Sequence, residues 1–518
     1  MRLWLAIIVG KICAFASRLL KRGGGSSLPG SLARRIEPHI LVRLLEKAGP
    51  ALTSIIITGS NGKTTTARMV AEVLQHNGLR IVWNRSGANM VSGIISALIE
   101  RCDIWGRLSA DAAVFEVDEA NLRHVVAAIR PRIILVTNCF RDQLDRYGEV
   151  DTTLGLIRAA IEDAPAGSLL LLNADDPLVA SLASRSRCKT MFYGIEGLDL
   201  ALDLACGHAP GHAQAGRVPD MNLSHDARSC PNCGAYYEYS LITYGHLGKY
   251  RCPRCLSSRP APDFLALNVV AQGAHGFTFT VGFEHDLEHD PVRASLGLPG
   301  LYNVYNCLAA VACCLLLDIP RRIIEEGIAR SSSAFGRMET IPVGDRNVLL
   351  ALVKNPVGFS EVIRTIVSEA SEIPGVRRRL EAPGIQGTQE TQGALGAPRA
   401  PSKTLMVCLN DNFADGRDIS WIWDVDMERL SRNPSFVRSI VASGTRAEDM
   451  ALRLKYAGID QEKIYIEPDL DKALELGLRN LAPGETLYVL PTYTALLEVR
   501  EHIRRRRDAS HAREFWRA

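Results

Sequence analysis

The 518-residue sequence lacks a strong net charge, and it lacks an apolar run long enough to cross a membrane. Its formal net charge is +3, so composition alone gives no general attraction to nucleic acid. The apolar stretch Leu3–Ala16 is interrupted by Lys11 and is shorter than the roughly 20 residues that a spanning helix needs. No A-x-A-like cleavage site follows it, which argues against a signal peptide. The length predicts two or three globular domains.

The cysteines do not form a disulfide framework pattern. Most of the thirteen cysteines are scattered through apolar segments, which is typical of a reduced, cytoplasmic protein. Four of them stand in two C-P-x-C pairs that are separated by 18 residues. This spacing matches a zinc-binding pattern, and four thiolates close a tetrahedral shell with no open position for catalysis. We therefore predict a structural Zn²⁺ site with the ligands Cys230, Cys233, Cys252 and Cys255.

A nucleic-acid-binding zinc ribbon is the alternative use of these cysteines. The sequence between the two pairs is rich in tyrosine and has little positive charge, which does not favour it.

Residues 1–50 predict an N-terminal helical segment. The stretch Leu3–Ala16 runs into the basic sequence Ser17–Arg22, which indicates an amphipathic helix. Two interpretations of this helix are open. It packs on the next domain, or it makes weak contact with the inner face of the cytoplasmic membrane.

The most informative stretch is Ile55–Arg68, which reads IIITGSNGKTTTAR. Its β-branched start predicts a buried strand, and its glycines predict a turn into a helix. Backbone N–H groups and the positive end of the helix dipole would then surround one point, which suits a phosphate. Lys63, which we expect to be exposed to the ligand, would reach the β- and γ-phosphates, and Thr64 would ligate Mg²⁺. The predicted nucleotide-binding residues are Gly59, Asn61, Gly62, Lys63, Thr64 and Thr65.

Alternating strand and helix patterns from residue 51 onward predict a parallel, doubly wound α/β sheet. The alternation breaks around the cysteine pairs, which indicates an insertion at residues 225–260. A second alternation begins at Val348–Val353 and predicts a Rossmann-like domain over residues 339–518. Within it, residues 375–402 are rich in Gly, Pro, Gln and Ala, and we expect them to form a disordered surface loop.

Polar side chains follow or flank these predicted elements. Glu116 lies at the end of the predicted strand Ala112–Val117, where doubly wound folds bind ligands, and is a candidate Mg²⁺ ligand. Asn303 and Asn306 stand one helical turn apart and can both face a nucleotide base. Capping of that helix by Asn303 is the simpler interpretation, and the two roles are compatible.

Several of these segments resemble the Mur ligases. Ile57 replaces the first glycine of a standard G-x-x-x-x-G-K-[ST] loop, and Thr58–Thr65 resembles the shorter TGxNGK[ST]T loop of Mur ligases and folylpolyglutamate synthases. The sequence after Thr137 resembles the family segment TNxxxDHLDxxG, with Gln143 in place of a histidine that usually helps to hold a second metal. Phe335–Glu339 resembles the family linker, whose arginine, here Arg337, contacts the nucleotide. The resemblance implies a central ATP-binding domain over residues 51–338.

The segment Leu409–Asp424 contains four aspartates and two tryptophans directly after a predicted strand. Asx-turns would account for one or two of the aspartates. Together with the cysteine pairs and Pro491–Ala495, this segment resembles the MurT family, the Mur ligase-like synthetase subunits of lipid II isoglutaminyl synthases. The resemblance implies ATP-dependent amidation of the α-carboxylate of D-isoglutamate in the lipid II stem peptide. The product would be D-isoglutamine, formed through an acyl phosphate during peptidoglycan biosynthesis.

The resemblance also implies a partner. The sequence contains no Cys-His glutaminase signature, so ammonia would come from a separate GatD-type glutaminase subunit. Asp411 or Asp415 would complete the Cys-His arrangement of that partner. With Glu116 at the ATP site, these aspartates are the predicted catalytic residues.

Two alternatives to this function remain open. A ligase of the folylpolyglutamate synthase type would add an amino acid instead of ammonia. A non-catalytic subunit would bind ATP and zinc only to activate a partner. The phosphate loop begins at Thr58, which leaves no room before it for the uridine-binding domain of Mur ligases, so we expect a substrate recognised through a group other than UDP.

Overall fold

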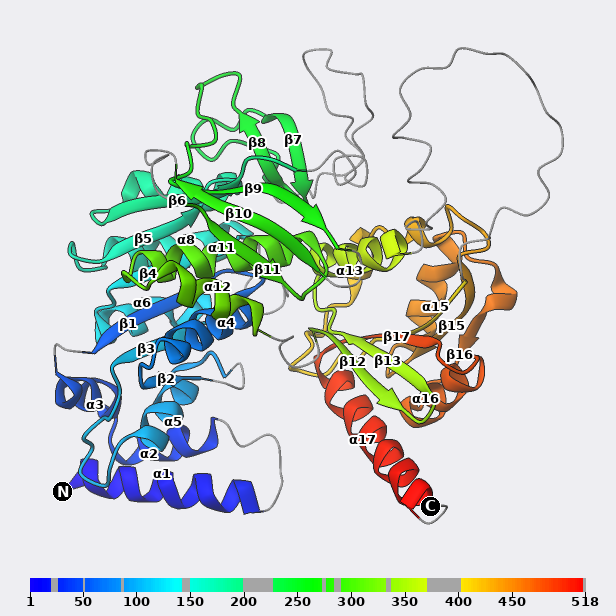
Figure 1. The fold of residues 1–518 in the computed structure, drawn as a ribbon, viewed down its shortest axis with the longest axis horizontal. Helices are drawn as coiled ribbons and strands as arrows, with labels where there is room; N and C mark the ends of the chain where they lie inside the picture. Colours follow the sequence, from blue (N-terminus) through cyan, green and yellow to red (C-terminus); the bar gives the residue numbers. More distant parts are fainter. Residues whose placement is uncertain are drawn as a thin grey trace. The chain divides into compact units, whose positions relative to one another are not determined.

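The computed structural model describes residues 1–19, 27–49, 52–84, 88–141, 150–198, 227–272, 276–283, 290–331, 337–369 and 402–515. Residues 375–401 of the predicted disordered loop and Gln143 lie outside these residues, as does the side chain of Arg337. The described residues up to 331 form one compact unit, and those from 337 onward form a second (Figure 1).

The first unit is built on a nine-stranded sheet with the order β11-β10-β9-β6-β5-β4-β1-β3-β2. The strands from β2 to β9 in this order pair in parallel, and β10 and β11 extend the sheet in antiparallel fashion. The strands are β1 (Thr53–Thr58), β2 (Ile81–Trp83), β3 (Ala112–Glu116), β4 (Ile133–Val136), β5 (Leu169–Asn173), β6 (Lys189–Ile195), β9 (Phe264–Ala271), β10 (Phe277–Phe283) and β11 (Val292–Leu296).

Helices cover both faces of this sheet because its central strands are apolar on both sides. Ile55, Ile56 and Ile57 of β1 are fully buried, as a strand between two parallel neighbours requires. One face packs on α5, α6 and α8, and the other packs on α4, α11 and α12. The helices of this unit are α1 (Arg2–Leu19), α2 (Leu28–Ile36), α3 (Ile40–Ala48), α4 (Lys63–His76), α5 (Val91–Arg101), α6 (Glu119–Ile129), α8 (Val150–Glu162), α9 (Pro177–Ser181), α11 (Leu301–Leu315) and α12 (Arg321–Ala329). This architecture confirms the predicted doubly wound α/β domain.

The N-terminal helix α1 packs against the first unit through α2 and α5. Ala6, Ile7 and Ala14 are buried in this contact, and Lys11 Nζ donates to the carbonyl oxygens of Ile99 and Cys102 at 2.8 Å and 2.6 Å. One side of the helix is therefore part of the domain. No described helix combines the length and the apolar character needed to cross a bilayer.

A separate hairpin of β7 (Glu238–Tyr244) and β8 (Leu247–Arg251) carries the two cysteine pairs at its base. It is inserted between β6 and β9, which are neighbours in the large sheet. The predicted insertion of a cysteine module into the central domain is confirmed.

The second unit contains a six-stranded sheet with the order β12-β13-β17-β14-β15-β16. Only β12 runs antiparallel to its neighbour, so the sheet is Rossmann-like, as predicted. Its strands are β12 (Arg337–Val343), β13 (Arg346–Ala351), β14 (Lys403–Cys408), β15 (Val437–Ser443), β16 (Ile464–Ile466) and β17 (Thr486–Pro491). Its helices are α13 (Pro356–Glu369), α15 (Ala447–Tyr456), α16 (Leu470–Arg479) and α17 (Tyr493–Phe515).

Candidate active site

The loop between β1 and α4 turns through glycines whose missing side chains allow close packing. Gly59 and Gly62 have φ angles of +120° and +85°, which L-residues with side chains rarely adopt. A Cβ atom at Gly59 would lie 2.4 Å from Thr137 Oγ1, and one at Gly62 would lie 2.0 Å from Asn306 Oδ1. The glycines therefore let the loop lie directly against the end of β4 and against α11.

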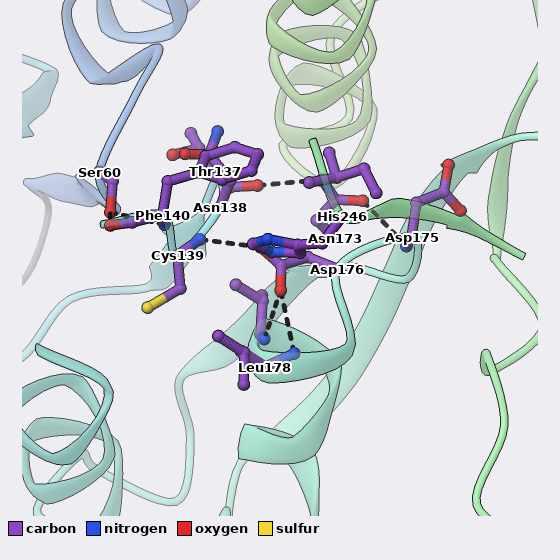
Figure 2. A network of polar contacts seen from close by, with 12 residues as sticks. Ser60, Thr137, Asn138, Cys139, Phe140, Asn173, Asp175, Asp176, Leu178 and His246 are labelled. Atoms are coloured by element: carbon purple, nitrogen blue, oxygen red, sulfur yellow. Dashed lines mark hydrogen bonds and ion pairs between the residues drawn. The ribbon is translucent and has the colours of Figure 1, made fainter. Parts of the chain in front are cut away.

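The end of β4 fixes the backbone of this loop before any nucleotide binds. The Asn61 N–H donates to Asn138 Oδ1 at 2.8 Å, and Asn138 Nδ2 donates back to the Asn61 carbonyl at 3.0 Å. Thr137 Oγ1 donates to the same carbonyl at 2.8 Å. Ser60 Oγ donates to the Phe140 carbonyl at 2.8 Å and accepts the Phe140 N–H at 2.9 Å (Figure 2). These hydrogen bonds preorganise the loop and fix its turn toward α4.

Lys63 is buried, which differs from our expectation that it is exposed to the ligand. Its side chain is 8% exposed, and Nζ donates to Glu119 Oε1 at 2.8 Å. Nζ also donates to the Gly59 carbonyl. The reason is the position of Glu119, which begins α6 just after the end of β3, the neighbour of β1. Its carboxylate supplies the negative charge that a bound phosphate would supply. Sequence reasoning assigned no role to Glu119, because its place after the helix cap Asp118 does not reveal a partner 56 residues away.

Glu116 lies at the end of β3, where hydrogen bonds to Asn84 hold its backbone. Its N–H donates to Asn84 Oδ1 at 3.0 Å, and Asn84 Nδ2 donates to its carbonyl at 2.8 Å. The residue is 4% exposed, and its Oε2 atom has no hydrogen-bond partner among the described residues. A buried carboxylate oxygen without a donor is costly, and a divalent cation with oxygen ligands would satisfy it. The donor set at this position fits Mg²⁺.

Asn303 and Asn306 lie in the first turns of α11, where both are buried. Asn306 Nδ2 donates to Asn303 Oδ1 at 3.1 Å, and Asn303 Nδ2 donates to the Pro299 carbonyl at 2.7 Å. The helix N-cap is Gly300, so the structure does not bear out capping by Asn303. Because Asn306 lies against Gly62, α11 and the phosphate loop belong to one site.

The four predicted zinc ligands come together at the base of the β7–β8 hairpin. All four Sγ atoms lie within 4.8 Å of one another, with Cys230 and Cys255 3.6 Å apart and Cys233 and Cys252 3.5 Å apart. A tetrahedral site with Zn–S bonds of about 2.3 Å has sulfur atoms about 3.8 Å apart, so this cluster has the dimensions of a zinc shell. The Cys255 N–H bonds to Cys252 Sγ and lowers the pKa of that thiol to about 6.

The tip of the β7–β8 hairpin is connected to the predicted nucleotide site by hydrogen bonds to α11. Tyr305, between the two asparagines, hydrogen-bonds Thr243 Oγ1 at 2.8 Å and donates to Asp175 Oδ2 at 2.6 Å. Arg259 Nε donates to Asp175 Oδ1 at 2.6 Å, and the Gly248 N–H donates to the Asp175 carbonyl at 2.9 Å. Full burial raises the pKa of Asp175 even with Arg259 beside it. The cysteine module is thus hydrogen-bonded to the helix that carries Asn303 and Asn306.

The same hairpin tip contacts the segment that holds the phosphate loop. His246 is fully buried, packs on Phe140 in a tilted arrangement with ring centroids 4.5 Å apart, and has Nε2 3.3 Å from Asp176 Oδ2 (Figure 2). Asp176 also accepts the Cys139 N–H at 2.8 Å and caps α9. Because the Phe140 carbonyl accepts the Ser60 hydroxyl, the hairpin tip packs on a residue that holds the phosphate loop.

In the second unit, the two candidate aspartates have different environments. Asp415 is buried, and its carboxylate accepts the Thr494 N–H at 2.7 Å and the Thr494 hydroxyl. Burial raises its pKa, although the Thr494 hydrogen bonds act in the opposite direction. Asp411 has a side chain that is 34% exposed, with Oδ1 accepting the Thr445 hydroxyl at 2.8 Å and Oδ2 3.7 Å from Arg446 Nη1. Phe413, between them, is 79% exposed.

These two aspartates lie at the carboxyl ends of β14 and β17, where Asn410 links the two strand ends. The Asn410 N–H donates to Thr492 Oγ1 at 3.0 Å, its Nδ2 donates to Thr494 Oγ1 at 2.9 Å, and its Oδ1 accepts the Thr445 N–H at 3.0 Å. Asn410 is a further residue that sequence reasoning left without a role. Asp415 therefore holds the loop, and Asp411 stands on its surface.

Comparisons with known proteins agree with both units. Residues 57–212 match the Mur ligase middle domain, and residues 387–496 match the MurT ligase C-terminal domain. The chain is 32% identical over 515 residues to the MurT subunit of lipid II isoglutaminyl synthase (glutamine-hydrolyzing) of Staphylococcus aureus strain COL, covering 98% of each chain. It is 32% identical to the MurT subunit of Streptococcus pneumoniae R6, covering 96% of each chain. Its fold is similar to that of a pseudomurein peptide ligase type C from Methanothermus fervidus, with a TM-score of 0.58, 23% identity and coverage of 88% of this chain and 78% of that one.

Proposed function

This chain belongs to the MurT family of lipid II isoglutaminyl synthase subunits, and from that premise we propose that it amidates the stem peptide of lipid II with ATP. The acceptor is the α-carboxylate of D-isoglutamate, and the product is D-isoglutamine for peptidoglycan biosynthesis. The observation that carries the proposal is the phosphate loop, in which a buried lysine lies beside a strand end with an unsatisfied carboxylate.

The chemistry follows from the weakness of a carboxylate as an electrophile. A carboxylate oxygen of the acceptor attacks the γ-phosphorus of ATP, and ADP leaves. Ammonia then attacks the carbonyl carbon of the acyl phosphate, inorganic phosphate leaves with the electron pair of the C–O bond, and the nitrogen loses a proton. The protein mainly positions the reactants and neutralises charge.

The described residues supply these functions in named positions. Gly59, Gly62 and the start of α4 offer backbone N–H groups to the phosphates. Lys63 exchanges Glu119 for phosphate oxygens, which keeps its charge paired in both states. Glu116 and Thr64 would hold Mg²⁺, which supplies charge neutralisation to the transferred phosphoryl group. Asn303 and Asn306 would contact the base. For Arg337, the family resemblance alone implies a contact with the nucleotide.

We further propose that the cysteine cluster binds one structural Zn²⁺ per chain. Its role would be to hold the β7–β8 hairpin, whose tip supports the phosphate loop and α11. The thiol groups and the ATP dependence support a cytoplasmic site of action.

Cys230→Ser is expected to lose the zinc and part of the thermal stability, because a Cys₄ site contributes folding energy directly. Elemental analysis of reduced protein should give one zinc for the wild type and much less for the variant. Cys307→Ser is the matched control, since Cys307 is buried in α11, distant in sequence from the cluster, and should leave the zinc content unchanged. Zinc-free wild-type protein with normal stability would contradict the proposal.

The proposed division of labour has a direct test. The chain alone should amidate lipid II when ammonium is supplied and should not hydrolyse glutamine. Glutamine should become a nitrogen source only when a GatD-type glutaminase subunit is added. Amidation replaces an –OH group by –NH2 and so slightly lowers the mass of the stem peptide, which mass spectrometry measures. Glutamate release measures the hydrolysis of glutamine. Glutamine hydrolysis by this chain alone would contradict the assignment.

A further inference from the structure

Helix α1 has an apolar side that the described residues leave exposed. Ala6, Ile7 and Ala14 face the domain, whereas the opposite side presents large side chains to solvent. The exposed fractions are 42% for Trp4, 47% for Leu5, 62% for Ile12 and 69% for Phe15. These positions follow the spacing of one helical stripe. Figure 1 shows α1 along the outer edge of the first unit.

A loop next to α1 adds more exposed apolar surface. Ile104 and Trp105, between α5 and β3, are 47% and 60% exposed. The following residue, Gly106, lies against Ile7 of α1, since a Cβ atom at this position would lie only 3.1 Å from Ile7 Cδ1. Lys47 Nζ donates to the Trp105 carbonyl at 2.6 Å, so the loop is held in this position. We name the surface formed by Trp4, Leu5, Ile12, Phe15, Ile104 and Trp105 the α1 face.

The N-terminal sequence that contains α1 is basic. The first 36 residues contain seven Lys and Arg residues and no Asp or Glu, although the whole chain has a formal charge of only +3. Arg2, Arg34 and Arg35 are exposed. The nearby carboxylate of Asp103 is engaged within its own loop, where it accepts the Trp105 and Arg107 N–H groups at 2.9 Å and 2.8 Å.

We propose that the α1 face docks the protein on an anionic lipid surface. Exposed tryptophans with aliphatic neighbours suit the boundary between headgroups and acyl chains, and a basic N-terminal segment without acidic residues suits anionic headgroups. Because the inner side of α1 is packed on the domain, the helix would lie along the surface. This inference rests on the proposed function for its purpose, since docking would bring the ATP site to a lipid-linked acceptor.

Charge decides against a second copy of the chain as the occupant of this face. Two copies related by a two-fold axis would bring two basic, acid-free segments together, and like charges across an interface are unfavourable. An anionic lipid surface instead neutralises them.

The test is flotation of the full-length protein with two kinds of vesicle. Wild-type protein should float with vesicles of phosphatidylcholine and phosphatidylglycerol at 7:3, and at least tenfold less with phosphatidylcholine alone. Raising the salt from 0.1 M to 0.5 M should release it, because the attraction is screened. The double variant Ile12→Glu/Phe15→Glu should lower binding to the anionic vesicles at least tenfold, since each exposed apolar side chain is replaced by a charge.

Leu452→Glu is the matched control, because Leu452 is an exposed helical leucine of the second unit, 46% exposed, and its variant should bind vesicles as the wild type does. Failure of the wild type to float, equal flotation with both vesicle types, or unchanged flotation of the double variant would each overturn the proposal. The proposal would also be overturned if the wild type did not bind vesicles but formed concentration-dependent dimers that the double variant does not form. ATP-driven amidation of detergent-solubilised acceptor should be the same in the double variant and wild type, which separates this test from failure of the proposed function.

Discussion

Lys63→Ala is expected to reduce ATP-dependent amidation by about 10³-fold, the upper end for removal of one preorganised charged donor. In the structure Lys63 Nζ donates hydrogen bonds to Glu119 Oε1 and to the Gly59 carbonyl. Without this charge, the phosphate loop loses its positively charged partner for the triphosphate and for the charge that develops on the γ-phosphoryl group. Initial rates with saturating ammonium and varied ATP would measure the loss.

This variant needs a control for stability, because Lys63 is buried. Removal of one partner from a buried ion pair leaves the other charge uncompensated, which can cost about 3–5 kcal/mol. We therefore expect Lys63→Ala to lower the melting temperature as well as the rate. The double variant Lys63→Met/Glu119→Gln removes both charges and should regain much of the stability while remaining inactive. Activity that returned together with stability would remove the catalytic role of Lys63.

Asp411→Asn is expected to lower glutamine-dependent amidation by about 10⁴-fold while ammonium-dependent amidation stays close to that of the wild type. The proposal behind this prediction is that the partly exposed Asp411 carboxylate orients a histidine of the glutaminase partner. A carboxylate in that position fixes the imidazole tautomer and stabilises its charged form, and its loss can cost about 10⁴-fold. The environment favours Asp411 over Asp415, because only Asp411 presents its carboxylate at the surface.

Asp415→Asn provides the comparison. Its carboxylate accepts two hydrogen bonds from Thr494, so the amide variant would lose acceptor capacity at a buried position and destabilise the second unit by about 1–3 kcal/mol. We expect a lower melting temperature and similar losses in both assays. Parallel assays with glutamine and with saturating ammonium, on both variants, decide the matter. Equal losses for Asp411→Asn in the two assays would leave it a substrate-binding or structural role.

The local sequence was sufficient for the elements that depend on neighbouring residues. The β-branched run before Gly59 predicts a buried strand, and the glycines predict the turn into α4. The spacing of the cysteine pairs predicts a four-sulfur cluster, since each C-P-x-C knuckle brings its own two thiols together. The alternation of strands and helices predicts two doubly wound sheets. These features follow from short-range geometry and from hydrophobic patterns that any sequence displays directly.

Tertiary structure alone decided the state of the site residues, because their partners are distant in the chain. Lys63 is paired with a carboxylate 56 residues away, and Asp415 with a threonine 79 residues away. Tyr305 meets Thr243 across 62 residues, which ties the cysteine hairpin to the nucleotide site. No residue type or spacing reveals such pairs, since the packing of whole elements sets them. The sequence by itself determined which groups could do the chemistry, and the fold determined which of them are buried, which are paired and which stand on a surface.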